Sequence, residues 1–256
     1  MRGARPGGKM AAELAWESTL GISGIKALTF DVFGTVVDWR TSISEEGRRL
    51  GEAKGIQADW LAFADAWRGG YTPAMDSVRK GDLPWTNIDG LHRIILDDIL
   101  DEFGIVSLSE EDRDEFNRAW HRLDPWPDVV SGLGKLKKNF LIAPLSNGHV
   151  ALLINMAKRA GLVWDCVLSA ELSGHYKPDP EVYTKAAQLL GMRTEQVMMV
   201  AAHPFDLRAA QAVGMRAAYV SRPLEFGPAT TPEQPDPGEF DVYVTDFLDL
   251  AKQLES

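Results

Sequence analysis

Short apolar runs alternate with amphipathic segments over the first 40 residues and the second half of the chain. The runs are typical of buried parallel strands, and the segments between them place apolar residues at helical spacing. Strands that alternate with helices imply right-handed crossovers and a parallel sheet, so the pattern predicts an α/β fold. The predicted strands lie at about 27–30, 140–145, 166–169, 197–202, 217–220 and 241–244, and the predicted helices lie at about 150–160, 180–190, 206–213 and 247–254.

Between Thr41 and Trp126 only the helical spacing remains. Cap residues followed by acids begin a helix near Ser42, apolar positions repeat at helical spacing over 59–68 and 87–100, and a further helix runs from Ser109 through Trp120. No strand is predicted there. We therefore predict an α/β core made of residues 21–40 and 128–256, with an all-helical cap inserted at 41–127. A cap hinged beside the ends of the strands would close over a substrate and exclude water.

Composition and charge argue against a nucleic-acid-binding protein and against a membrane-spanning one. The chain has 256 residues, 45% of them hydrophobic and 25% charged, and a formal net charge of -10. No basic patch stands out, which argues against a nucleic-acid partner. No apolar stretch approaches the roughly 20 residues of a membrane helix, so we expect no membrane partner. Residues 1–9 are basic and Gly-rich, and we expect residues 1–20 to be a disordered tail, with 10–20 a short helix or loose.

The single cysteine, Cys166, lies in an apolar run and is predicted to be a buried core thiol. One cysteine excludes an intrachain disulfide, and a reducing, cytoplasmic compartment is expected.

Polar residues that could carry chemistry follow the predicted strands. Asp31 ends the first strand, and ligands of open α/β sheets bind at the carboxyl ends of strands. An Asp that merely caps a loop is the alternative. Three more stretches follow later strands: Ser-Asn-Gly at 146–148, Tyr-Lys-Pro-Asp-Pro at 176–180, and Ala-Ala-His-Pro-Phe-Asp at 201–206.

Together these stretches resemble the haloacid dehalogenase superfamily. In detail they look like its L-2-haloacid dehalogenase (type II) branch, whose pattern has Asp-x-Tyr/Phe-Gly-Thr, then Ser-Asn-Gly, then Tyr-Lys-Pro-Asp-x-x-Val-Tyr. The chain reads Asp-Val-Phe-Gly-Thr at 31–35, and Tyr-Lys-Pro-Asp-Pro-Glu-Val-Tyr at 176–183. The resemblance implies a Rossmann-like parallel-sheet core and hydrolysis of short 2-haloalkanoic acids, haloacetates included, to 2-hydroxy acids through an aspartyl ester.

The resemblance also implies five catalytic residues. Asp31 would be the nucleophile, Lys177 would keep it ionised, and Thr35 would orient it. Asp206 would position or activate water. His203 stands where the branch has Asn, and an imidazole could take part in that role, since it can accept a proton near neutral pH. A structural histidine is the alternative for His203.

Five further residues are implied to bind substrate or halide. Arg68, which follows a tryptophan in a cap helix, and Asn147 would donate to the departing halide. Ser146, with backbone amides around Val32 and Phe33, would hold the substrate carboxylate. Arg68 as a solvated helix residue is the alternative.

Two other functions stay open. A phosphatase of the same fold would need a second Asp at position 33 and a Gly-Asp pair near 201–202 to hold magnesium. The chain has Phe33 and Ala201-Ala202 there, which weakens that hypothesis. A non-catalytic binding module is the third hypothesis, although Asp31, Lys177 and Asp206 are intact.

No cofactor and no metal are expected. His92 and His121 lack metal-ligand spacing, and the chain has no Cys/His cluster for zinc. His149 either faces the pocket or begins an exposed helix. Tyr183 is expected to pack its helix rather than join the site. The implied partner is a small-molecule haloacid, and a homodimer is left open.

Overall fold

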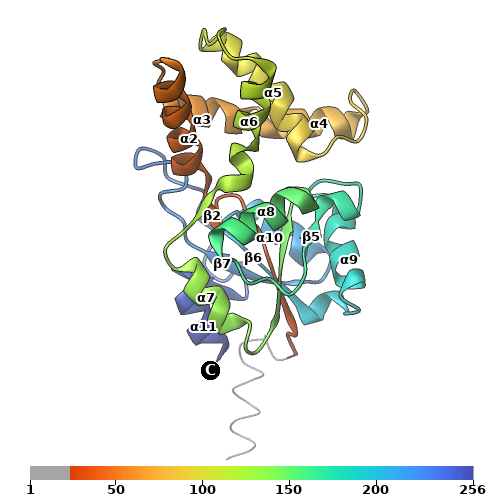
Figure 1. Ribbon diagram of the computed structural model, residues 1–256. Helices are drawn as coiled ribbons and strands as arrows, with labels where there is room; N and C mark the ends of the chain where they lie inside the picture. The colour runs from red at the N-terminus through yellow and green to blue at the C-terminus, as the bar shows by residue number, and fades with distance from the viewer. Residues whose placement is uncertain (1–23, 256) are drawn as a thin grey trace, which may run out of the picture.

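The computed structural model describes residues 24–255 and consists of a parallel sheet flanked by helices, with a second group of helices above it (Figure 1). The sheet has six strands in the order β5-β4-β1-β6-β7-β8, and every pair in it is parallel. Its strands are β1 (Ala27–Phe30), β4 (Leu141–Ser146), β5 (Leu168–Ser169), β6 (Val197–Ala201), β7 (Arg216–Val220) and β8 (Val242–Val244).

Strand β1 lies near the middle of this sheet, between β4 and β6, where its mostly apolar sequence, Ala-Leu-Thr-Phe, is buried. All four residues of β1 are buried, as are all five of β6, which is typical of parallel strands covered on both faces. Phe30 pairs with Pro144 of β4 and with Val200 of β6. The carboxyl ends of these three strands therefore meet at one edge of the sheet.

Within residues 24–255, five α-helices flank the sheet. Several contain apolar residues at helical spacing, as in α8, which buries Leu152, Leu153 and Met156. They are α7 (Val129–Leu136), α8 (Val150–Ala160), α9 (Pro180–Leu189), α10 (Pro204–Ala212) and α11 (Phe247–Leu254), with the short 3₁₀ helices η2 (Ala170–Leu172) and η3 (Thr194–Gln196) between strands.

The upper group, here called the helical insertion, comprises residues 39–122. It packs around an aromatic cluster in which Phe63 and Phe116 both contact Trp67. Its elements are α2 (Trp39–Lys54), α3 (Trp60–Gly69), α4 (Tyr71–Lys80), α5 (Ile88–Glu102), α6 (Glu110–Asn117) and the 3₁₀ helix η1 (Arg118–Arg122). Two short antiparallel strands, β2 (Val37–Asp38) and β3 (Asp124–Pro125), join it to the sheet domain.

The α/β fold is confirmed, and the predicted strands and helices lie close to those observed. Three differences stand out. The helix expected near Ser42 begins at Trp39, because the Asp38 side chain caps it by accepting from the Thr41 amide. Helices α4 and α7 had not been predicted. The predicted absence of strands between 41 and 126 is wrong at β3. The expected tail at 1–20 lies outside the described residues.

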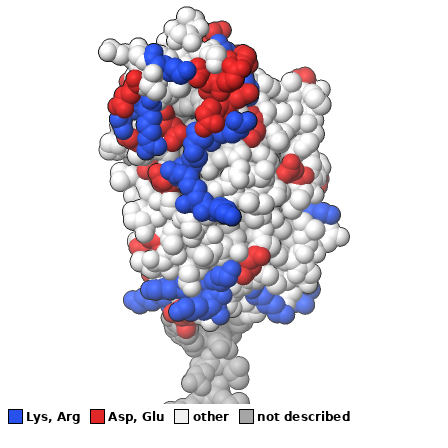
Figure 2. Space-filling model, in the orientation of Figure 1, with Lys and Arg blue, Asp and Glu red and all other residues white. Residues whose placement is uncertain are grey.

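Charged side chains of both signs interleave over the helical insertion on the face shown in Figure 2. Ion pairs account for this pattern: Arg48 pairs with Glu45 and Glu52 within α2, and Arg122 pairs with Glu46 and Glu115. Exposed pairs of this kind are each worth roughly 0–1 kcal/mol. Within residues 24–255, no helix is both long and apolar enough to cross a membrane.

Candidate active site

Asp31 leaves the end of β1 and is held by the turn that follows. Its backbone amide still donates to Val200 of β6, and its side chain is almost fully buried. The hydroxyl of Thr35 donates to Asp31 Oδ2 at 2.7 Å and accepts from the Ala202 amide at 2.9 Å. Thr35 thus ties the carboxylate to the ends of two strands, which fits its predicted orienting role.

Lys177 joins two carboxylates at the strand ends. Its ammonium lies 2.8 Å from Asp31 Oδ1 and 2.5 Å from Asp206 Oδ2, and all three side chains are buried. Asp206 also accepts from the hydroxyl of Tyr183 at 2.5 Å, so Tyr183 contacts this group instead of only packing its helix.

These contacts shift the pKa values of the buried acids in opposite directions. Burial alone would raise the pKa of Asp31, but the Lys177 ammonium and the His203 ring together hold it well below its usual range. Burial raises the pKa of Asp206, with the charge of Asp31 adding to the rise and Lys177 opposing it. Asp31 is therefore held ionised at neutral pH. Its Oδ1 accepts only from Lys177 among the described residues, which leaves a lone-pair direction open.

His203 lies between two carboxylates. Its Nδ1 is 3.0 Å from Asp31 Oδ2, and its Nε2 is 3.0 Å from both oxygens of the buried Glu225. Burial opposes the charged ring, but Glu225 and Asp31 outweigh it and raise the pKa of His203 to about 10. An imidazolium cannot accept a proton, so the role expected of His203 requires that the ring first lose this charge.

Arg68 projects from α3 toward the same site. Its guanidinium carbon lies 4.2 Å from the centre of the Tyr71 ring and 5.8 Å from that of Trp39. Its Nη1 is buried, with no hydrogen-bond partner among residues 24–255. A buried, unpaired cationic donor is costly unless an anion completes it. A fully solvated helix residue does not fit this placement.

The Ser-Asn-Gly stretch contributes one residue to the site. Asn147 accepts from the Lys177 amide at 2.7 Å, and its Nδ2 is 3.3 Å from the sulfur of Met75. Ser146 is fully buried and accepts from the Gly148 amide at 3.0 Å.

A cavity of about 770 Å³ brings the predicted residues together. The residues around it come from the helical insertion and from the strand ends, and they include Asp31, Phe33, Arg68, Asn147, Lys177, His203 and Asp206. Ser146 and Val32 are not among its lining residues. His149 does not line it either, and His149 is buried rather than exposed.

Sequence reasoning missed Glu225 and its neighbours. The Trp39 indole donates to Glu225 Oε1 at 3.1 Å, and a Cβ on Gly34 would meet the same oxygen at 2.0 Å. Arg222, in the same turn, donates to the carbonyl of Thr35 at 2.9 Å. Arg222 and Glu225 follow β7 in a Pro- and Gly-rich loop, where the sequence shows no helical or strand periodicity.

Comparisons with known proteins agree with this geometry. A family model described as haloacid dehalogenase-like hydrolase matches residues 25–214. The chain is 30% identical to (S)-2-haloacid dehalogenase 1 of Pseudomonas sp. (strain CBS-3), over 77% of this chain and 85% of the relative.

Two crystal structures superpose closely on this chain. One is a defluorinating L-2-haloacid dehalogenase, with a TM-score of 0.88 and 43% identity over 91% of this chain and 96% of the other. The second is another L-2-haloacid dehalogenase, with a TM-score of 0.87 and 44% identity over 91% and 99% of the two chains.

Proposed function

Because the chain belongs to the haloacid dehalogenase-like hydrolases, we propose that it hydrolyses the carbon–halogen bond of short (S)-2-haloalkanoic acids. The proposal rests on one observation: the same cavity contains the carboxylate of Asp31 and the buried Nη1 of Arg68, which has no hydrogen-bond partner among the described residues. The first supplies a nucleophile, and the second supplies a donor for an anion.

The first step is a displacement. Asp31 Oδ1 attacks C2 of the substrate from the side opposite the halogen, the carbon–halogen bond breaks, and halide leaves with its electron pair. Arg68 and Asn147 donate to the developing halide charge as positioned groups. Lys177 keeps Asp31 ionised before attack and remains beside Asp206 after it.

Water completes the reaction. Its oxygen attacks the Cγ carbonyl of the Asp31 ester, the acyl–oxygen bond breaks, and a 2-hydroxy acid leaves while the carboxylate of Asp31 returns. One proton is released overall. Esterification removes the negative charge of Asp31, which is one of the two carboxylates that hold the pKa of His203 high. The pKa of His203 therefore falls in the ester, and the ring becomes a better acceptor for the proton of the water that Asp206 helps to position.

The helical insertion serves as the cap in this proposal. It supplies Arg68, Tyr71 and Met75 to the cavity wall, opposite the strand ends that supply Asp31 and Lys177. Closing the two parts around a haloacid would exclude bulk water during displacement. The lone Cys166 supports a reducing, cytoplasmic compartment, and a homodimer is compatible with the proposal.

Halide release from a panel of 2-haloacids tests the function. The panel contains both enantiomers of 2-chloropropionate, chloroacetate and fluoroacetate, since one of the similar structures is described as defluorinating. We expect release from the S enantiomer, with inversion, and none from Asp31→Asn, because an amide is a far weaker nucleophile than a carboxylate. Asp65→Asn is the matched control: Asp65 lines the same cavity but pairs with Arg40.

A single turnover in ¹⁸O-labelled water separates the mechanisms. Label should appear first in Asp31 and not in the product. Label found at once in the hydroxy acid would mean direct attack by water and would refute the ester. Hydrolysis of an aryl phosphate without halide release would favour the phosphatase, and the absence of any turnover would favour a binding module.

A further inference from the structure

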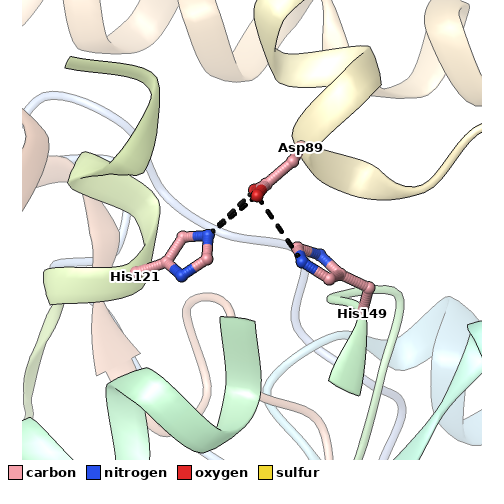
Figure 3. Close-up of side chains that lie close together, drawn as sticks. All are labelled: Asp89, His121 and His149. Carbon is pink, nitrogen blue, oxygen red and sulfur yellow. Dashed lines mark hydrogen bonds and ion pairs between the residues drawn. The ribbon is translucent and has the colours of Figure 1, made fainter. Parts of the chain in front are cut away.

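Three side chains that are far apart in the sequence converge where the helical insertion meets the sheet domain (Figure 3). Asp89 comes from the first turn of α5, His121 from η1, and His149 from the residue directly before α8. The Nε2 atom of His121 lies 3.0 Å from both carboxylate oxygens of Asp89, and the Nε2 atom of His149 lies 3.5 Å from Oδ2. One ligand-capable atom from each residue lies within 4.8 Å of the others.

The ring of His149 lacks the partners that a buried imidazole needs. The residue is 6% exposed, and its Nδ1 has no hydrogen-bond partner among the described residues. Its Nε2 points at Asp89 at the outer limit of a hydrogen bond, as Figure 3 shows. A metal ion would give Nε2 a bond in place of this long contact, whereas Nδ1 would carry the ring hydrogen.

We propose that Asp89, His121 and His149 bind a divalent transition-metal ion, with Zn²⁺ the best match. Bonds of about 2.0–2.2 Å in a tetrahedral site place ligand atoms about 3.3–3.6 Å apart. The 3.5 Å between His149 Nε2 and Asp89 Oδ2 lies in that range, and the 3.0 Å between His121 Nε2 and Asp89 would widen slightly when the ion binds. Two imidazole nitrogens and one carboxylate oxygen suit Zn²⁺, whereas Mg²⁺ and Ca²⁺ prefer oxygen ligands alone.

The surroundings of the three residues fit such a site. Asn155 Nδ2 of α8 lies 3.0 Å from His121 Nδ1 and holds that ring in place. A metal ion at Nε2 requires Nδ1–H to donate, and the Asn155 amide accepts it after a 180° flip that exchanges its oxygen and nitrogen. The Asp89 side chain is 29% exposed, so the fourth position would face solvent and take a water. None of the three ligands lines the cavity that contains Asp31. The ion would therefore tie the insertion to the sheet domain and take no part in the displacement.

Cobalt titration of tag-free protein tests the site directly, because four-coordinate Co²⁺ absorbs visible light strongly. The protein is first stripped with a chelator and freed of it. We expect one Co²⁺ per chain, displaced by one Zn²⁺, and a melting temperature that rises by several degrees with Zn²⁺, since a ligand of the folded state stabilises it. His149→Gln, His121→Gln and Asp89→Asn should each weaken Zn²⁺ binding by about 100-fold or more, because loss of even an outer partner typically costs 10–100-fold.

His175→Gln is the matched control. His175 also lies near two carboxylates, at 3.6 Å from Asp179 and 3.9 Å from Glu181, but it is exposed. This variant should bind cobalt as the wild type does. Circular dichroism identifies any variant that fails to fold, and the other two ligand variants then decide the outcome. Absence of a one-to-one cobalt complex in the wild type, or unchanged affinity in the folded ligand variants, would mean that the three residues form only a polar contact between the two parts.

Discussion

At the level of single residues, the unpaired guanidinium of Arg68 predicts a strict requirement for arginine. Arg68→Lys should lose most of the halide-release activity, by about 100-fold, since removing one positioned donor typically costs 10²–10³ in rate. An ammonium offers neither the planar fork nor the same stacking on Tyr71. Steady-state halide release measures the effect, with Arg48→Lys on the exposed face of α2 as control. A near-normal rate in Arg68→Lys would mean that Arg68 makes no contact essential to halide release.

Glu225 predicts how the stability of the protein depends on pH. The pKa of His203 is raised from 6.5 to about 10 in the folded protein. The charged ring therefore contributes stability that is fully present below pH 6.5 and is lost as the pH rises through 10. In Glu225→Gln the pKa of His203 should fall, so the alkaline loss of stability should begin at lower pH.

Urea unfolding between pH 6 and pH 11 measures this shift. Glu233→Gln is the control, because Glu233 lies further along the same loop and pairs with the exposed Arg208. Superimposable pH profiles for the wild type and Glu225→Gln would show that Glu225 does not set the charge of His203.

The site shows which residues a sequence can reveal. Asp31, Lys177 and Asp206 follow strands, and the topology of a parallel sheet brings strand ends together, so their proximity could be predicted. Glu225 follows no pattern, because its position depends on how one irregular loop packs against Gly34 and Trp39. The protonation of His203 could not be predicted from the sequence for the same reason, because it depends on the positions of both neighbouring carboxylates, Asp31 and Glu225.

Among the elements, the turn between β1 and β2 depends on a glycine. Gly34 has φ +88°, and a Cβ there would lie 2.0 Å from Glu225 Oε1. Gly34→Ala should destabilise the protein by about 2 kcal/mol or more, since a left-handed backbone and a clash are combined. It should also reduce activity, because Glu225 must move away from His203.

Gly55→Ala separates the two causes. Gly55 has φ +69° at the end of α2, and a Cβ there meets nothing within 4 Å. The cost should therefore be about 1 kcal/mol, from the backbone alone. Urea unfolding compares the two variants, and equal losses would show that the contact with Glu225 adds nothing.

Helices α4 and α7 were not predicted from the sequence, and the structure shows why. Helix α4 starts after Gly70, with no side-chain cap and a proline in its first turn, so the usual signal for a helix start is absent. Helix α7 contains Gly132, and the Cβ of Phe247 in α11 packs so close that a side chain on Gly132 would clash. Glycine is a poor helix former, and here tertiary packing decides the conformation. The pair β2 and β3 is too short to leave a periodic pattern.

For the whole molecule, Phe33 and Ala202, which stand where a magnesium-dependent relative would have acids, predict chemistry that needs no metal ion. Displacement of halide places one negative charge on the leaving atom. Phosphoryl transfer relies on a bound cation to offset the several negative charges of the phosphoryl group. Halide release at 25 °C should therefore be unchanged in excess chelator and unaffected by added Mg²⁺.

Chelation would also remove Zn²⁺ from the site at Asp89, His121 and His149, and this should lower the melting temperature without lowering the rate at 25 °C. Mg²⁺ is a poor match for two imidazoles. Activity that disappears on chelation and returns with Mg²⁺ would therefore indicate a metal ion at Asp31 and Asp206 and would refute the dehalogenase mechanism.

The pairing of β2 with β3 has a consequence for gene rearrangement, because it holds the two ends of the helical insertion next to each other. The chain leaves the sheet domain at Asp38 and returns at Asp124, and these two residues are partners in the ladder. The two ends of the long helical excursion are thus neighbours, as are the ends of any tight hairpin. A DNA segment encoding residues 39–123 could be gained, lost or exchanged in one event, and the register of the six-stranded sheet would be preserved. The ancestral boundary between the two parts would then be a single pair of facing residues.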